Sequence, residues 1–130
     1  VEERPFEALG YRHLTAVRRG PVPGGLFRAD FTRDDRHLLL LQVAPEGAEV
    51  ILAEDPARGN DPRTSCCISR RRGKATTYVT VLQPYRSEPT VQLLSVEGEG
   101  DLTVKVTTND GEDVLALPEA LDGEVRLGGE

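Results

Sequence analysis

The sequence predicts an all-β fold, an antiparallel β-sandwich of roughly nine or ten strands. Three observations lead to this prediction. Residues that favour turns recur at intervals of about eight to twelve along the chain, which is typical of sandwiches and barrels. The runs between these turns are rich in Val, Leu, Ile, Thr and Tyr and have the length of strands. One run also alternates apolar and polar residues, as a half-buried antiparallel strand does.

The alternating run predicts a hairpin near the end of the chain. Residues 101–108 place three aliphatic side chains on one face and Thr and Lys side chains on the other. Residues 109–111 (Asn-Asp-Gly) tolerate a positive φ and suit a tight turn. An aliphatic run follows at 114–117, so we expect residues 101–117 to form the hairpin.

Three further runs predict strands elsewhere. Residues 38–43 form a short aliphatic run that ends just before a Pro-Glu-Gly turn at 45–47, which favours a buried strand over a helix. We expect residues 48–53 to return from that turn and pair with this strand as a hairpin. Residues 75–83 are substantially apolar on both faces, so we place that strand centrally, between two layers.

Length and composition indicate one β-sandwich domain spanning residues 1–130. The formal charge of -6 argues against a nucleic-acid partner, and no apolar run approaches the length of a membrane span. The chain contains no Met. Either an initiator methionine has been removed before Val1, or the chain is a piece of a longer protein.

The charge is distributed unevenly. Residues 1–87 carry a net charge of +3, whereas residues 88–130 hold two basic side chains against 11 acidic ones, a net charge of -9. Acidic turns that keep exposed strand edges from associating explain this pattern most simply. The alternative is an acidic surface that contacts a basic neighbour.

The cysteines and histidines show no pattern typical of a disulfide, a metal site or a catalytic site. Cys66 and Cys67 are adjacent, so a strand would point them to opposite faces, and we expect neither a structural disulfide nor a zinc site. The histidines, His13 and His37, have no second ligand at a useful spacing and are interpreted as strand-surface residues. We therefore predict no metal ion and no cofactor.

The most concentrated charge is the candidate binding site. Arg70, Arg71, Arg72 and Lys74 follow one another around Gly73 and could hold a carboxylate or sulfate by paired hydrogen bonds. A solvated hairpin tip, or an ion-pair partner for the acidic third of the chain, is the simpler explanation. The segment lacks the leading glycine and the following helix of a phosphate-binding loop.

The same segment resembles a stretch near the end of heparinase II/III-like proteins. Residues 67–74 (CISRRRGK) and 76–86 (TTYVTVLQPYR) are similar to a strand that ends in Arg-Arg and Gly and leads into a strand of the form stFvaVleP, then Tyr. Residues 11–20 (YRHLTAVRRG) resemble the opening of that region, and residues 48–56 (AEVILAEDP) resemble a further strand. The likeness extends over about residues 11–117.

The resemblance implies that the chain is the C-terminal β-sandwich domain of a larger polysaccharide lyase. Such proteins join an α/α toroid to a β-sandwich region and cleave uronate-containing polysaccharides by β-elimination, typically with Tyr and His as base and acid. No residue here aligns with a catalytic position, so the implied domain is inactive alone. Its implied partners are the remaining domains and an acidic polysaccharide, and its implied location is periplasmic or extracellular.

Two alternatives remain open. An autonomous carbohydrate-binding module is disfavoured by the absence of Trp, because sugar-binding surfaces usually use aromatic faces. A generic protein-interaction module would use the acidic residues 88–130 as its docking surface.

Overall fold

The chain is built from antiparallel β-strands, as predicted. The computed structural model describes residues 2–3, 13–22, 25–55, 64–119 and 126–128. The strands are β1 (Glu2–Glu3), β2 (Thr15–Pro21), β3 (Leu26–Arg33), β4 (Arg36–Val43), β5 (Glu49–Asp55), β6 (Thr64–Arg70), β7 (Val79–Tyr85), β8 (Val91–Glu97), β9 (Leu102–Thr108), β10 (Gly111–Leu117) and β11 (Arg126–Gly128). The nine strands from β2 to β10 are seven or eight residues long, and β1 and β11 are shorter.

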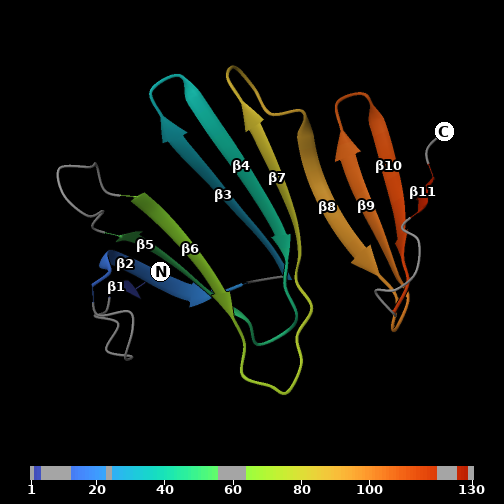
Figure 1. Ribbon diagram of the computed structural model, residues 1–130, viewed down its shortest axis with the longest axis horizontal. Coiled ribbons are helices and arrows are strands. Elements are labelled where there is room, and N and C mark those ends of the chain that lie inside the picture. The colour runs from blue at the N-terminus through green and yellow to red at the C-terminus, as the bar shows by residue number, and fades with distance from the viewer. Residues whose placement is uncertain (1, 4–12, 23–24, 56–63, 120–125, 129–130) are drawn as a thin grey trace. The chain divides into compact units, whose positions relative to one another are not determined.

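The strands form three sheets in two compact units (Figure 1). Unit 1 comprises Val1–Gly25 and Ala44–Thr77 and contains sheet A, with the strand order β1-β2-β5-β6. Unit 2 comprises Leu26–Val43 and Tyr78–Glu130 and contains sheet B (β3-β4-β7) and sheet C (β11-β10-β9-β8). Every pairing in these sheets is antiparallel.

The core of unit 1 lies on one face of sheet A. Ile51 of β5 is fully buried and is paired with Ile68 of β6. Val17 of β2 and Ala53 of β5 are buried in the same cluster. Because residues two apart on a strand share a face, the side chain of Glu49 lies on the same side of β5 as Ile51 and Ala53.

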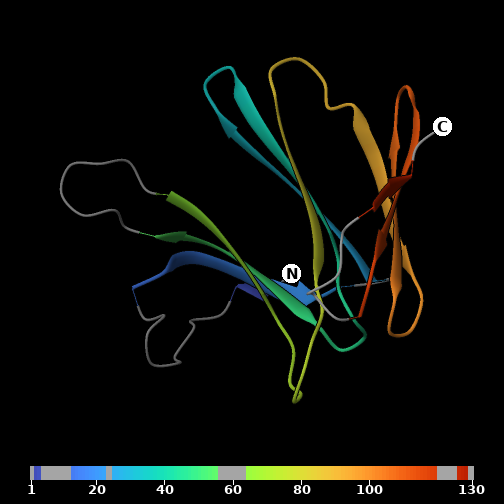
Figure 2. The same cartoon turned by 45° about the vertical axis from the view of Figure 1, so that its right-hand side comes forward.

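Unit 2 has its own core, which is shared by sheets B and C. Leu39 and Leu41 of β4 are almost completely buried and cluster with Val91 and Leu94 of β8 and Val104 of β9. In both views the strands of this unit follow one another in the order β3, β4, β7, β8, β9, β10 (Figures 1 and 2). Two antiparallel sheets around one apolar core are the arrangement predicted for a β-sandwich.

The hairpin predicted over residues 101–117 is confirmed. Strands β9 and β10 pair from Leu102 with Leu117 to Thr108 with Gly111, and Asn109 and Asp110 form the turn between them. The Asn109 amide is held by a hydrogen bond of 3.0 Å to the Thr90 carbonyl oxygen.

Two predictions about neighbouring strands are wrong. β4 and β5 do not form a hairpin, because β4 pairs with β3 and β7 whereas β5 pairs with β2 and β6. β7 begins at Val79 and lies at the edge of sheet B, so it is not a central strand. The apolar residue Leu82, on the face of β7 opposite the core, suggested burial on both sides. In the structure Leu82 is 58% exposed.

Shortening Ile51 will test the core of unit 1. We expect Ile51→Ala to lower the free energy of unfolding by about 2–5 kcal/mol, because it leaves a cavity in a fully buried position, and Ile51→Val by about 0.5–1.5 kcal/mol. Urea denaturation followed by far-ultraviolet circular dichroism measures both. Equal and negligible effects of the two variants would contradict the burial of this side chain.

Candidate anion-binding pocket

The candidate site is at the end of sheet A where three strands meet in one row. Pro21 at the end of β2, Glu49 at the start of β5 and Arg70 at the end of β6 are directly paired across the sheet. Directly opposed residues in a sheet point to the same face, so their side chains lie side by side. The row therefore brings together residues that are far apart in the sequence.

A tight turn before β5 forms another wall of the site. The Ala48 amide donates a hydrogen bond of 3.1 Å to the Pro45 carbonyl oxygen, and Gly47 between them has a φ of 77°. A positive φ at the third residue of such a turn strains any residue with a side chain, which explains a glycine at this position. The Val22 amide bonds to the Ala48 carbonyl oxygen at 3.2 Å and so ties the turn to the end of β2.

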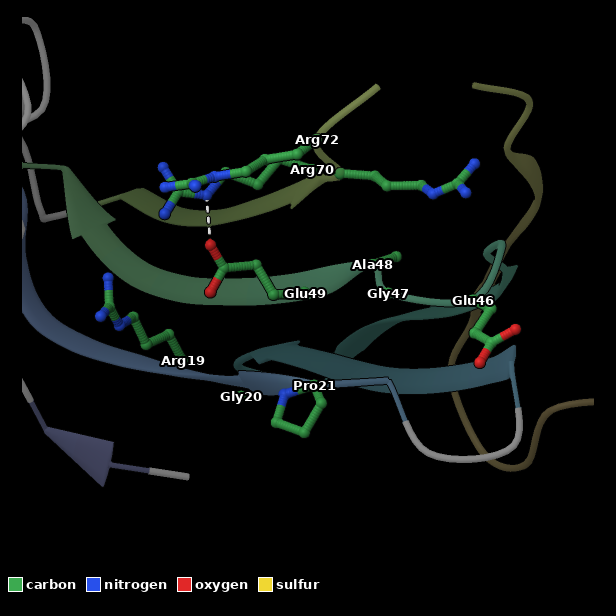
Figure 3. A pocket seen from close by; sticks show the side chains of 10 residues that line it. Arg19, Gly20, Pro21, Glu46, Gly47, Ala48, Glu49, Arg70 and Arg72 are labelled. Atoms are coloured by element: carbon green, nitrogen blue, oxygen red, sulfur yellow. Dashed lines mark hydrogen bonds and ion pairs between the residues drawn. The ribbon is translucent and has the colours of Figure 1, made fainter. Parts of the chain in front are cut away.

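These elements surround an open pocket of about 1050 Å³ (Figure 3). Its charged lining residues are Arg19, Arg70, Arg71, Arg72, Glu46 and Glu49, four cations against two anions. Glycine, proline and alanine of β2 and the turn provide the rest of the lining. The pocket thus has a net positive charge, although the whole chain is acidic.

Arg70 and Glu49 form an ion pair in the pocket. Arg70 Nε donates to Glu49 Oε1, and the dashed line in Figure 3 joins these groups. The side chains are 42% exposed for Arg70 and 31% for Glu49. Ion pairs as open as this contribute about 0–1 kcal/mol to stability, so the pair does more to orient the two groups than to hold the fold.

The other three arginines also line the pocket. Arg71 and Arg72 are exposed and follow β6 at the edge of the sheet, and Arg19 is half-buried on β2. Among the described residues, the arginines that form salt bridges are Arg70 and Arg86. Planar guanidinium groups bind carboxylates and sulfates through paired hydrogen bonds, so this arrangement can hold an anionic ligand.

The structure brings together most of the residues expected from the sequence. Arg70, Arg71 and Arg72 line the pocket, whereas Lys74 is exposed and lies outside the lining. Arg19 was not predicted to belong to the site. The sequence around it predicts a strand, but it does not show that β2 and β6 both pair with β5. Glu49 was missed for the same reason, since strand register is not visible in a single run of residues.

The two cysteines are neighbours on β6. Cys66 and Cys67 are free thiols in the half-buried part of β6. Burial, and to a lesser degree the neighbouring Cys66, raises the pKa of the Cys67 thiol. A raised pKa keeps the thiol protonated and weakly nucleophilic at neutral pH, in accord with a packing role.

The histidines lie apart from the pocket lining. His13 is an exposed neighbour of Asp55, with 3.7 Å between Nε2 and Oδ1. His37 hydrogen-bonds the Thr32 hydroxyl through Nδ1 at 2.9 Å and stacks on Tyr85 with 4.8 Å between ring centres. Within the described residues, no group of three or more His, Cys, Asp or Glu side chains is placed to hold a metal ion.

Tyr85 of β7 links that histidine to a carboxylate on β3, which lies on the other side of β4. Its hydroxyl donates a hydrogen bond of 2.6 Å to Asp30 Oδ2. This hydrogen bond, together with partial burial and the negative charge of Asp30, raises the pKa of Tyr85, and Arg28 opposes the shift. The polar groups of this cluster satisfy one another, and the Tyr85 ring packs against the core of unit 2.

Comparison with known proteins returned no relatives. Searches of protein-family models, curated proteins and solved structures found no match for the chain. Within its described part, the chain has no helix long and apolar enough to cross a membrane. A ligand is therefore inferred from the charges and geometry of the pocket itself.

Replacing Asp30 will test the Tyr85 cluster. We expect Asp30→Ala to lower the pKa of Tyr85 towards the ordinary tyrosine value, because the acceptor and the negative charge are both removed, and Arg28→Ala to raise it further. Titration of the tyrosinate ultraviolet absorbance measures both changes once the curve of a Tyr85→Phe variant, which retains Tyr11 and Tyr78, is subtracted. The wild-type contribution to stability is present below pH about 10 and is lost as the pH rises through the raised pKa. Shifts of the same sign in the two variants would contradict this assignment.

Proposed function

We propose that this chain is an accessory, non-catalytic β-sandwich domain that binds an acidic polysaccharide through the pocket of unit 1. The observation that carries the proposal is the lining itself, four arginines around an open hollow at the end of a regular sheet. A rigid sheet is a suitable support for such a site because the backbone pairing keeps the side chains at fixed spacings.

The chemistry of the lining favours carboxylates or sulfates on a long ligand. Each guanidinium can donate two parallel hydrogen bonds to one such group, and several arginines can engage successive groups of a polymer. The pocket is open to solvent at the edge strand β6, so a chain can cross it without having to thread through a closed cavity. Uronate-containing or sulfated polysaccharides carry these groups at regular intervals.

The resemblance to heparinase II/III-like proteins supports a place within a larger polysaccharide lyase. In that setting β-elimination would be carried out by the remaining domains, and this domain would hold the polysaccharide beside them. Arg70, Arg71 and Arg72 lie in the segment that carries the likeness and also line the pocket. Lys74 belongs to the resembling segment but not to the lining.

One surface favours a second candidate function, a protein-interaction module. The face of sheet B opposite the core carries Phe31, Leu38 and Pro84 in one row, and Leu40 and Leu82 beside the buried Ala29 in the next. Leu82 is more than half exposed, and an apolar sheet face of this kind commonly contacts another protein. The remaining domains of a parent protein would be such a partner.

Single arginine substitutions distinguish binding in the pocket from non-specific attraction to the positive charge of the chain surface. We expect Arg72→Ala to weaken binding of a uronate polysaccharide such as alginate by about tenfold or more, because it removes charge-assisted hydrogen bonds. Arg18→Ala removes the same charge from the opposite face of β2, outside the lining, and should change affinity by no more than about twofold. Isothermal titration calorimetry at constant ionic strength measures both.

The same measurements can refute the proposal. If the wild-type chain binds neither alginate nor heparin, acidic-polysaccharide binding is wrong and the protein-interaction module takes its place. If Arg18→Ala loses as much affinity as Arg72→Ala, the binding is diffuse and the pocket is not its site. Lys74→Ala is a third variant to measure. If it loses as much polysaccharide affinity as Arg72→Ala, the binding site includes residues outside the pocket lining.

A further inference from the structure

Glu49 is a carboxylate built into a pocket that otherwise attracts anions. It lies on the central strand of the three that form the site, directly paired with Arg70 on one side and with Pro21 on the other. Its side chain lines the pocket and is only partly exposed. Any anion that approaches Glu49 therefore meets a negative charge that water screens less than it screens a fully exposed carboxylate.

The register places cations on both sides of this carboxylate. Arg19 is paired with Ile51, two residues along β5 from Glu49, and Arg70 lies on the opposite neighbour β6. The backbones of Arg19 and Arg70 are thus separated by two strand spacings, about 10 Å across the sheet, and by about 7 Å along it. Figure 3 shows the carboxylate of Glu49 turned towards Arg70, with Arg19 on the far side of β5.

We propose that Glu49 determines which anions the pocket accepts, rejecting compact, highly charged anions and admitting chains whose anionic groups are separated by hydroxyl-bearing units. This inference rests on the proposed function of the pocket and specifies its ligand. A compact anion cannot reach Arg19 and the β6 side together without lying against Glu49. Like charges in such proximity oppose binding, and Arg70 is already occupied by Glu49.

An extended ligand avoids this conflict. One anionic group can bind Arg19 and the next can bind Arg71 or Arg72, while the unit between them lies over Glu49. An ionised carboxylate only accepts hydrogen bonds, and the bond from Arg70 uses Oε1. Oε2 is then placed to accept a hydrogen bond from a hydroxyl of the intervening unit. The pocket would thus select ligands in which a hydroxyl group lies between two anionic groups.

Sodium tripolyphosphate and an alginate oligosaccharide are the probes that test this role, each titrated calorimetrically into the full chain at constant ionic strength. We expect the wild type to bind the oligosaccharide and to bind tripolyphosphate weakly. Glu49→Gln keeps the size and one acceptor oxygen but removes the charge, so it should bind tripolyphosphate about tenfold or more tightly. Glu54→Gln makes the same change on the opposite face of β5 and should leave both affinities within about twofold of the wild type.

The outcomes distinguish this inference from the proposed function. If Glu49→Gln and a second variant, Glu49→Thr, both keep the wild-type circular dichroism spectrum and neither gains affinity for tripolyphosphate, the selective role of Glu49 is wrong. An equal gain in Glu54→Gln would also overturn it, because the effect would then be one of net charge. If the wild type fails to bind the oligosaccharide while Glu49→Gln gains tripolyphosphate binding, polysaccharide binding is wrong but Glu49 still excludes compact anions.

Discussion

The register of β5 between β2 and β6 determines both the core and the pocket of unit 1. With the observed pairing, Ile51 lies in the apolar cluster and Glu49, two residues away, faces the same side at the end of the sheet. A slip of one residue would turn both side chains to the other face. The burial of Ile51 resists such a slip, so the hydrophobic core also positions the charged groups of the pocket.

The arrangement of the pocket brings like charges close together, and their repulsion is destabilising. Four arginines around one hollow repel each other, and solvent access together with the carboxylates of Glu46 and Glu49 reduces that repulsion. The exposed positions of Arg71 and Arg72, beyond the last paired residue of β6, keep their charges in water.

The sequence predicted the structure best where a strand has one solvent-exposed face and one buried face. Residues 101–117 alternate cleanly and have a turn that fits, so their hairpin was predicted correctly. Residues 75–83 were misplaced because an apolar second face has two explanations, burial between layers or an uncovered surface, and composition cannot separate them. Leu82 belongs to the second case.

Pairing between distant strands was harder to predict than the strands themselves. The short turn at residues 45–47 suggested a hairpin, yet it joins strands of two different sheets. Arg70, Arg71 and Arg72 were recognisable as a local cluster of charge, while Arg19 and Glu49 join them only through the register of sheet A. A local pattern can therefore predict part of the pocket, and the remainder depends on contacts between segments that are far apart in the chain.

Pro84 affects how β7 can interact with other strands. It lies within an edge strand, on the same face as the exposed Leu82 and opposite Leu38 of β4. Proline has no N–H group, so this edge cannot offer an unbroken row of donors to an incoming strand. Edge strands with apolar side chains are otherwise templates for intermolecular β-pairing. A single imino acid thus interrupts the row of donors on the strand that carries Leu82, the most exposed large apolar residue among those that the structure describes.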